Sequence, residues 1–210
     1  MTPTHGGRLE DRVALVVRAG SPFGRAVMGR LIAEGARAVA LEGGLGDPQE
    51  RRAAVEAVVA AHSNLDILVV PTPPVVGGGV LDPDADEDRA AVDGVVRTTF
   101  FLVQEAAGVM RRGGRVCIAA PTRPPDTPND ATAPATSIEG ALIALVRLVA
   151  VELAPRGIAV NALCPIARDA DPAAVAAGLA FLASDDASYV LGASVPVGGG
   201  DGDVSAPAVR

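Results

Sequence analysis

The feature that most constrains the fold is the stretch 136–165, in which a long apolar helix pattern runs directly into an apolar strand pattern. The helical part carries only three charged residues, Glu139, Arg147 and Glu152. A helix so apolar on all sides must be covered on more than one side. Thr136 and Glu139 have capping-box spacing, which predicts that the helix begins at Thr136. The stretch therefore predicts a helix that packs on a parallel sheet and on something else.

Composition narrows the possible partners and compartments. A chain of 210 residues with 49% hydrophobic content is long enough for one α/β domain, and its net charge of −7 argues against nucleic acid or an anionic membrane surface. The sequence shows neither an apolar run of transmembrane length nor a signal peptide, so we expect a cytoplasmic protein. Cys117 and Cys164 lie in apolar strand patterns and are expected to be reduced core residues. His5 and His62 are isolated, so no metal site is predicted.

Strand patterns alternate with helix patterns along the chain, which predicts a doubly wound α/β fold with a parallel sheet. The predicted strands are 12–17, 37–41, 65–70, 114–120, 158–164 and 189–197. Helices are predicted between them, with Asp-Pro pairs at 47–48 and 171–172 as cap and first helical residue. We expect a single domain over 1–210, with a core at 9–200 and tails at 1–8 and 201–210.

Several runs resemble the classical short-chain dehydrogenase/reductase (SDR) family, of the kind that includes acyl-carrier-protein ketoreductases. The resemblance covers roughly residues 9–200 and is carried by LDILV, TFFLVQEAA, GALIALVRLVAVELAPRGIAVNALCP and PAAVAAGLAFLASDDASYVLGASVPVGGG. It implies a Rossmann-like fold, and in active members it implies carbonyl reduction with NAD(P)H.

The catalytic residues that the resemblance implies do not appear at their positions. Active members use a tyrosine as proton donor, a lysine four residues later, a serine and an asparagine. The matching positions here are, in that order, Ala135, Glu139, Ala119 or Ala120, and Val96. All 18 basic residues are arginine, and the single tyrosine is Tyr189. We therefore expect no catalytic residues and lean towards a chain that is not an enzyme by itself.

The glycine-rich cofactor turn of the family is also altered. Its TGxxxGxG pattern is replaced by VRAGSPFG at 17–24, in which Arg18 and Pro22 stand where two glycines belong. Pro22 has no N–H to offer a phosphate, although Arg18 could still attract one, so weak nucleotide binding stays open. Ser21 before Pro22 also fits an ordinary helix cap. Gly20 and Gly24 are interpreted as vestiges of a cofactor site, and no bound cofactor is expected.

The crossover between the second and third predicted strands is too short for the extra helix and strand that the family places there. We therefore expect the sheet to lack one edge strand. Glu42 matches the acidic position that binds the adenosine ribose in NAD-preferring members, but it is interpreted as a vestigial surface residue. The family's NNAG becomes VPTP at 70–73, which removes polar groups that brace the central strand. Only residues 166–171 precede the last helix, so the substrate lid is also expected to be missing.

The parts that resemble the family's subunit contacts are intact. Both long helices are apolar on more faces than one sheet can cover, and leaving that surface wet would create an aggregation patch. We predict that the chain is a catalytically inactive structural or regulatory partner of an active SDR paralogue, in a heterodimer or heterotetramer. The predicted interface residues are Phe101, Leu102, Glu105, Leu145, Leu148, Val149, Glu152, Tyr189 and Val195.

Two alternatives stay open. One is a redox-independent enzyme, such as a cyclase or dehydratase, that uses Glu139 or the carboxylates Asp126 and Asp130. The capping-box reading of Glu139 argues against it. The other is a homo-oligomeric scaffold or ligand-binding protein without a reductase partner.

Overall fold

The computed structural model describes residues 7–43, 45–73, 85–121, 133–165 and 170–198. Six parallel strands form one sheet in the order β2-β1-β3-β4-β5-β6. The strands are β1 (Val13–Val17), β2 (Arg37–Leu41), β3 (Ile67–Pro71), β4 (Arg115–Ala119), β5 (Ala159–Pro165) and β6 (Ser194–Val197). The helices are α1 (Pro22–Ala33), α2 (Pro48–His62), α3 (Ala85–Val109), α4 (Ala133–Leu153) and α5 (Pro172–Ala183). The predicted doubly wound parallel sheet is confirmed.

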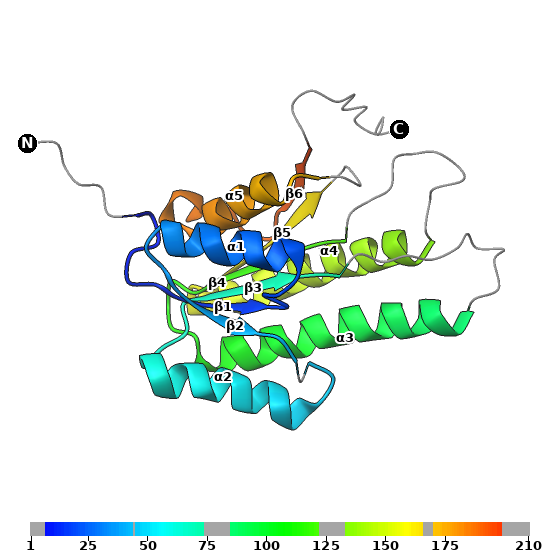
Figure 1. The fold of residues 1–210 in the computed structure, drawn as a ribbon, viewed down its shortest axis with the longest axis horizontal. Helices are drawn as coiled ribbons and strands as arrows, with labels where there is room; N and C mark the ends of the chain where they lie inside the picture. The colour runs from blue at the N-terminus through cyan, green and yellow to red at the C-terminus, as the bar shows by residue number, and fades with distance from the viewer. Residues whose placement is uncertain (1–6, 44, 74–84, 122–132, 166–169, 199–210) are drawn as a thin grey trace, which may run out of the picture.

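The helices form two layers, one on each face of the sheet (Figure 1). α1 and α5 pack on each other over one face, and α2, α3 and α4 cover the other. The central strands are buried throughout, and their alternate residues feed two separate cores. Leu102 and Leu142 lie in the core beneath α3 and α4, whereas Leu31 and Leu179 lie in the core beneath α1 and α5.

The predicted loss of an edge strand is confirmed among the described residues, where β2 is the outermost strand and no further strand pairs with it. After β2 the chain enters α2 almost at once and returns to β3 on the far side of β1. Since the linker is so short, α2 itself makes the crossover. The predicted absence of a lid concerns a linker of which 166–169 lie outside the described residues.

Helix caps confirm several local predictions. The hydroxyl of Ser21 accepts a hydrogen bond from the Gly24 N–H at 2.9 Å, and Pro22 is the first residue of α1. Asp47 caps α2 through the N–H groups of residues 49 and 50, and Asp171 caps α5 through residue 173. Each cap accepts N–H groups that the first helical turn leaves without partners.

Two predicted boundaries are wrong. α4 begins at Ala133, so Thr136 lies inside the helix and is not its cap. The first turn of a helix accepts Pro134, because the N–H groups of that turn make no intrahelical hydrogen bond and proline has none to lose. The last strand begins at Ser194 instead of 189, because Gly192 adopts a positive φ of 67° and only then does the chain align with β5.

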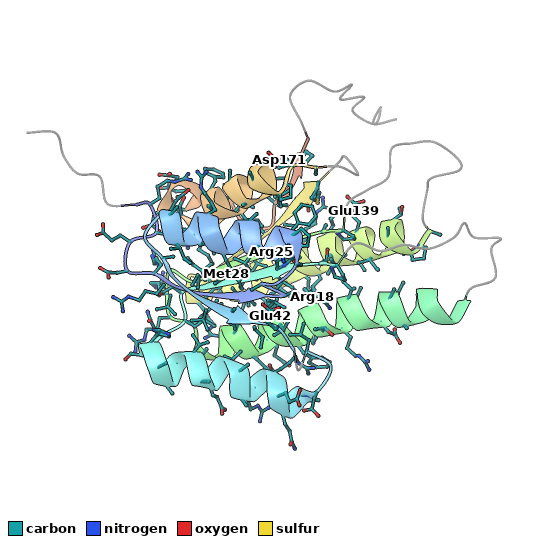
Figure 2. The ribbon with its side chains drawn as sticks, in the orientation of Figure 1. Arg18, Arg25, Met28, Glu42, Glu139 and Asp171 are labelled. Carbon is teal, nitrogen blue, oxygen red and sulfur yellow. The ribbon has the colours of Figure 1, made fainter. Side chains whose placement is uncertain are left out.

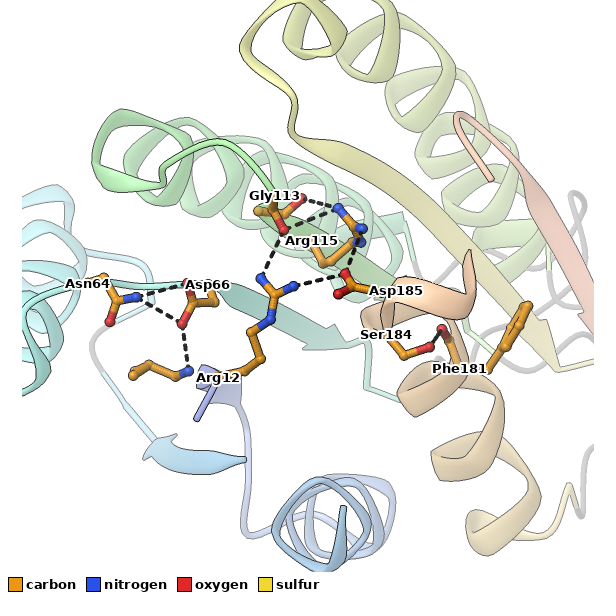
Figure 3. Close-up of polar contacts among 10 residues, drawn as sticks. Arg12, Asn64, Asp66, Gly113, Arg115, Phe181, Ser184 and Asp185 are labelled. Atoms are coloured by element: carbon orange, nitrogen blue, oxygen red, sulfur yellow. Dashed lines mark hydrogen bonds and ion pairs between the residues drawn. The ribbon is translucent and has the colours of Figure 1, made fainter. Parts of the chain in front are cut away.

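An ion-pair network fastens the amino edge of the sheet (Figure 3). Asp185, in the short 3-10 helix η2 (Asp185–Ala187), accepts from the guanidinium groups of Arg12 at 2.8 Å and Arg115 at 3.3 Å. Asp66 accepts from the Val13 N–H at 2.8 Å and so joins β3 to β1. This edge is structural, which leaves the opposite, carboxyl edge for ligand chemistry.

Candidate functional site

The turn after β1 brings the end of β2 close to the start of α1. The Arg18 N–H donates to the carbonyl of Leu41 at 2.7 Å, and the Ser21 N–H donates to the Arg18 carbonyl at 3.0 Å. Arg18 adopts a left-handed φ of 53°, which glycine would favour, so the turn keeps the backbone shape of a glycine-rich turn. A Cβ on Gly24 would lie only 2.2 Å from the Arg18 carbonyl oxygen, so this glycine is needed for close packing of the turn on α1.

Arg18 and Glu42 place opposite charges at this edge (Figure 2). Burial lowers the pKa of the Arg18 guanidinium, and no carboxylate of the described residues forms an ion pair with it. A cation in such a place gains free energy from an incoming anion. The carboxylate of Glu42 lies against Gly20, since a Cβ there would be 3.0 Å from its Oε2. The edge therefore offers a cation for a phosphate and an acceptor for hydroxyl groups.

The positions that match the family's catalytic residues lie along the same edge. Ala135, Ala119 and Ala120 are buried at the start of α4 and the end of β4, and Val96 is half-buried in α3. Glu139 lies in the second turn of α4, near the end of β5. Burial raises the pKa of the Cys164 thiol to about 11, and the negative charge of Glu139 adds to that shift. Tyr189 lies apart from this edge, fully exposed before β6.

Thr72 is a residue whose role the sequence analysis missed. Its hydroxyl donates to the Ala119 carbonyl at 2.7 Å, and its N–H donates to the same oxygen at 3.1 Å. Thr72 is buried and ties the end of β3 to β4. The expectation that VPTP removes the bracing of the central strand is therefore wrong, because Thr72 supplies a polar brace. In the sequence, the position of Thr72 between two prolines at the end of an apolar strand pattern could have indicated this role.

The space at this edge is small within the described residues. A hollow of about 10 Å³ lies below Arg18, lined by β1, β3 and α3, and a second one of about 10 Å³ lies between Phe23, Thr72 and Pro165. Each has room for about one water-sized group. The segments that follow β3, β4 and β5 (74–84, 122–132 and 166–169) lie outside the described residues, as do Asp126 and Asp130.

The predicted interface residues divide into four groups. Leu102 has no exposed surface and belongs to the core. Phe101 and Glu105 are turned towards α2, where they contact Arg51. Leu148, Glu152 and Tyr189 are exposed, whereas Leu145, Val149 and Val195 are half-buried.

A groove of about 200 Å³ lies between α3 and α4, and α4 also carries large apolar residues that are exposed. Phe100 and Val149 line the groove. Leu148 is 67% exposed and Val151 is 73% exposed on α4. Phe100 and Val151 were not among the predicted interface residues, although they belong to the same apolar helix patterns. Leu148 and Val151 lie three residues apart on the exposed side of α4, and we call these two residues the outer apolar face.

The family follows from this fold together with the comparisons. The family model described as enoyl-(acyl carrier protein) reductase matches residues 11–169. The chain belongs to the short-chain dehydrogenase/reductase family of oxidoreductases.

Individual relatives match nearly the whole chain. Meso-2,3-butanediol dehydrogenase from Serratia marcescens is 27% identical over 92% of this chain and 95% of its own length. A 3-oxoacyl-[acyl-carrier-protein] reductase from Staphylococcus aureus is 27% identical over 83% of this chain and 81% of its own. A short-chain dehydrogenase/reductase structure from Serratia marcescens has 30% identity and a TM-score of 0.81, covering 92% and 98% of the two chains. A Burkholderia cenocepacia structure in complex with NADP has 25% identity and a TM-score of 0.80, covering 92% and 99%.

These relatives correct two expectations. The expectation that leaned away from an enzyme is wrong, because the relatives that match most of the chain are dehydrogenases and reductases. The expectation of no cofactor is wrong as well, because a structural neighbour that matches nearly the whole chain is an NADP complex. The altered glycine-rich turn misled the sequence analysis, since Arg18 keeps the left-handed backbone that the missing glycine would have had.

Two further expectations concern absences. Among the described residues, no group of histidine, cysteine or carboxylate side chains could hold a metal ion. No helix in the described part of the chain is long and apolar enough to cross a membrane.

Proposed function

We propose that this chain is a subunit of an NAD(P)-dependent oxidoreductase of the short-chain family, assembled with a paralogous chain that carries the family's tyrosine and lysine. The observation that carries the assembly is the outer apolar face. Leu148 and Val151 are large apolar residues that are more than half exposed on one helix. Apolar residues gathered in this way mark a contact surface on a folded protein.

The composition supports a paralogous partner as the source of the proton-transfer groups. The chain contains no lysine, and its one tyrosine, Tyr189, lies away from the carboxyl edge. A methyl group at Ala135 cannot donate a proton. The hydroxyl and ammonium groups that the family's chemistry uses therefore come from the other subunit of the assembly.

The carboxyl edge supports binding of a dinucleotide by this chain. Arg18 is a partly buried cation without a carboxylate partner among the described residues, which suits the pyrophosphate. Glu42 beside Gly20 suits the ribose hydroxyl groups and disfavours a 2′-phosphate, so NAD is preferred over NADP. When bound, the nicotinamide ring supplies or takes up a hydride.

Titration of the purified chain with NADH and with NADPH tests the cofactor part. We expect saturable binding that is tighter for NADH, because Glu42 repels the extra phosphate of NADPH. Arg18→Gln should weaken the binding of NADH and of NADPH by about tenfold each, because one charge-assisted hydrogen bond is lost. Glu42→Gln should reduce the difference in affinity between NADH and NADPH. Arg37→Gln is the control. It also removes an arginine charge, but Arg37 lies at the start of β2 and pairs with Asp11. No saturable binding in the parent chain would refute cofactor binding.

Co-expression with a paralogue encoded nearby tests the assembly part. We expect the two chains to elute together with reductase activity. Leu148→Arg should separate them, because it places a charge on the outer apolar face. Ile32→Arg is the matched control, since Ile32 is 55% exposed on α1, on the opposite face of the sheet. Separate elution of the two parent chains would contradict the proposal, and a stable homotetramer of this chain alone would favour the homo-oligomeric alternative.

A further inference from the structure

The sheet ends at β2 in a strand edge that has no partner among the described residues. β2 is the outermost strand and pairs only with β1, in parallel register. After β2 the chain turns inwards, since Leu45 lines the hollow below Arg18 together with residues of β3 and α3. In the part of the chain that the structure describes, no strand pairs with the outer side of β2. We call this outer side the β2 edge.

The register of β2 on β1 shows which backbone groups reach the β2 edge. The Arg37 N–H donates to the Arg12 carbonyl at 2.8 Å, so the backbone groups of Arg37 point towards β1. Alternate residues of a strand bond to the same neighbour, so the third and fifth residues of β2 also point there. The N–H and carbonyl groups of Ala38 and Ala40 point the other way. The β2 edge therefore presents two donors and two acceptors.

The β2 edge lacks the features that keep an edge strand from pairing with another chain. Proteins protect such edges with proline, with charged side chains or with bulges. The strand at the other end of the sheet, β6, carries the exposed Pro196. β2 has no proline, and its only charged residue, Arg37, is its first residue. The residues in the middle of β2 are apolar, and Ala40 among them is exposed. Another strand can therefore add to this edge.

A second copy of this chain fits the β2 edge when the two β2 strands run antiparallel about Val39. Ala38 of each copy then lies opposite Ala40 of the other copy. Residues opposite each other at such a position exchange two hydrogen bonds, and the arrangement has two such positions. All outward donors and acceptors of both strands are then paired. The second copy is thus matched to the edge by the edge itself.

The side chains favour the same arrangement. Val39 is half-buried and packs on the core beneath α2, α3 and α4. The two copies of Val39 meet at the central position, where the strands approach most closely, and each covers apolar surface of the other. Arg37 begins β2 and Glu42 follows its last residue, so antiparallel strands bring opposite charges to each end of the pair. Parallel strands would bring like charges together.

We propose that this chain forms a symmetric dimer through its β2 edges, so that the sheets of two copies join into one continuous sheet. The two-fold axis passes between the two Val39 residues. The contact is independent of the proposed function. The outer apolar face lies on α4, which packs on β5, four positions away from β2 in the sheet. One chain can therefore make both contacts at once.

Disulfide cross-linking of the full chain tests the pairing. In this dimer the two Val39 Cα atoms lie about 4.5 Å apart, as at any such position of an antiparallel pair. A disulfide joins Cα atoms about 4.4–6.8 Å apart. Val39→Cys should therefore give a disulfide-linked dimer under a mild oxidant, seen on a non-reducing gel. The parent chain gives the background, since Cys117 and Cys164 are buried.

Ala40→Cys is the matched control. Ala40 is more exposed than Val39, so random collision would cross-link Ala40→Cys more readily. In the dimer the two Ala40 residues are diagonal neighbours about 7–8 Å apart, too far for a disulfide unless the backbone moves. We expect Ala40→Cys to cross-link much more slowly than Val39→Cys. Equal or faster cross-linking of Ala40→Cys, or no cross-linking of Val39→Cys, would overturn the proposal.

Sedimentation equilibrium measures the contact without added cysteines. Ala40→Pro removes an N–H that points away from β1, so the bonds between β1 and β2 stay in place. The dimer loses one donor from each copy, and its dissociation constant should rise about tenfold or more. Ala40→Val keeps the N–H and should leave the dissociation constant unchanged. Circular dichroism checks the fold of each variant.

Leu148→Arg separates this contact from the outer apolar face. It should leave the cross-linking of Val39→Cys unchanged, whatever it does to assembly with a paralogue. Loss of self-association in Leu148→Arg but not in Ala40→Pro would show that copies meet through α4 and would refute the β2 pairing. A parent chain that stays monomeric would refute it as well. If Ala40→Pro unfolds, the two cysteine variants decide alone.

Discussion

At the scale of single residues, glycines and ion pairs decide how closely the elements approach one another. Gly24 is surrounded by backbone atoms of the turn after β1, whereas Gly29, on the same helix, faces open space. Glu34, at the end of α1, accepts from Arg8 and Arg30, and in this way it holds the segment before β1 against the helix.

Gly24→Ala should destabilise the fold. Its Cβ would lie 2.2 Å from the Arg18 carbonyl oxygen and 2.7 Å from the Ala19 Cα, so the turn must move. We expect the free energy of unfolding in urea to fall by about 1–3 kcal/mol, the usual cost of overpacking. Gly29→Ala should instead raise it by about 0.5–1 kcal/mol, since alanine favours the helix. Equal effects of the two substitutions would contradict the close contact at Gly24.

Glu34→Gln should make the free energy of unfolding depend less steeply on pH in the acid range. The hydrogen bond from Arg8 holds the pKa of Glu34 below its ordinary 4.5, and Arg30 acts in the same direction. This stabilisation is present above pH 4.5 and is lost as the pH falls through the lowered pKa of the folded state. Urea unfolding between pH 7 and pH 3 checks this. An unchanged slope below pH 4.5 in the variant would refute the contribution of Glu34.

At the scale of elements, capping residues set where most helices begin. Asp47 and Asp171 each accept an N–H two residues later, and proline takes the first helical position after each of them. These starts were predictable because a cap and its proline are neighbours in sequence. The start of α4 at Ala133 was not, because the prediction relied on the capping-box spacing of Thr136 and Glu139.

Asp47→Ala should weaken the start of α2 by about 1 kcal/mol, because the N–H groups of Gln49 and Glu50 lose their acceptor. Urea unfolding measures the loss, and amide exchange should show faster exchange in the first turn of α2. Glu56→Ala, an exposed change farther along α2, should stay within about 0.5 kcal/mol of the parent chain. Equal losses in both variants would argue against the cap.

At the scale of the whole molecule, the sheet separates two cores, each of which contains one thiol. Cys117 belongs to the core under α1 and α5, and Cys164 to the core under α2, α3 and α4. Both are free and buried, as the sequence predicted. The two thiols therefore report on the two layers of the fold separately.

Both thiols should stay unreactive towards a thiol reagent at pH 8 until the protein unfolds. Burial raises the pKa of Cys117 from 9.0 to about 12 and that of Cys164 to about 11. In the unfolded chain the thiols ionise first, so the free energy of unfolding should fall as the pH rises from 9.0 towards 12. Cys117→Ala should reduce this slope. Rapid labelling of either thiol in the folded protein would show that its layer opens on its own.

The sequence by itself determined the alternation of strands and helices, the short crossover that leaves β2 at the edge, and the absence of lysine. These follow from neighbouring residues and from composition. Only the tertiary structure decided that Leu102 is buried while Leu148 is exposed, since helical periodicity does not tell which apolar face meets the sheet. The tertiary structure also brought Arg51 of α2 to Glu105 of α3, because partners on separate helices meet only after the layers pack.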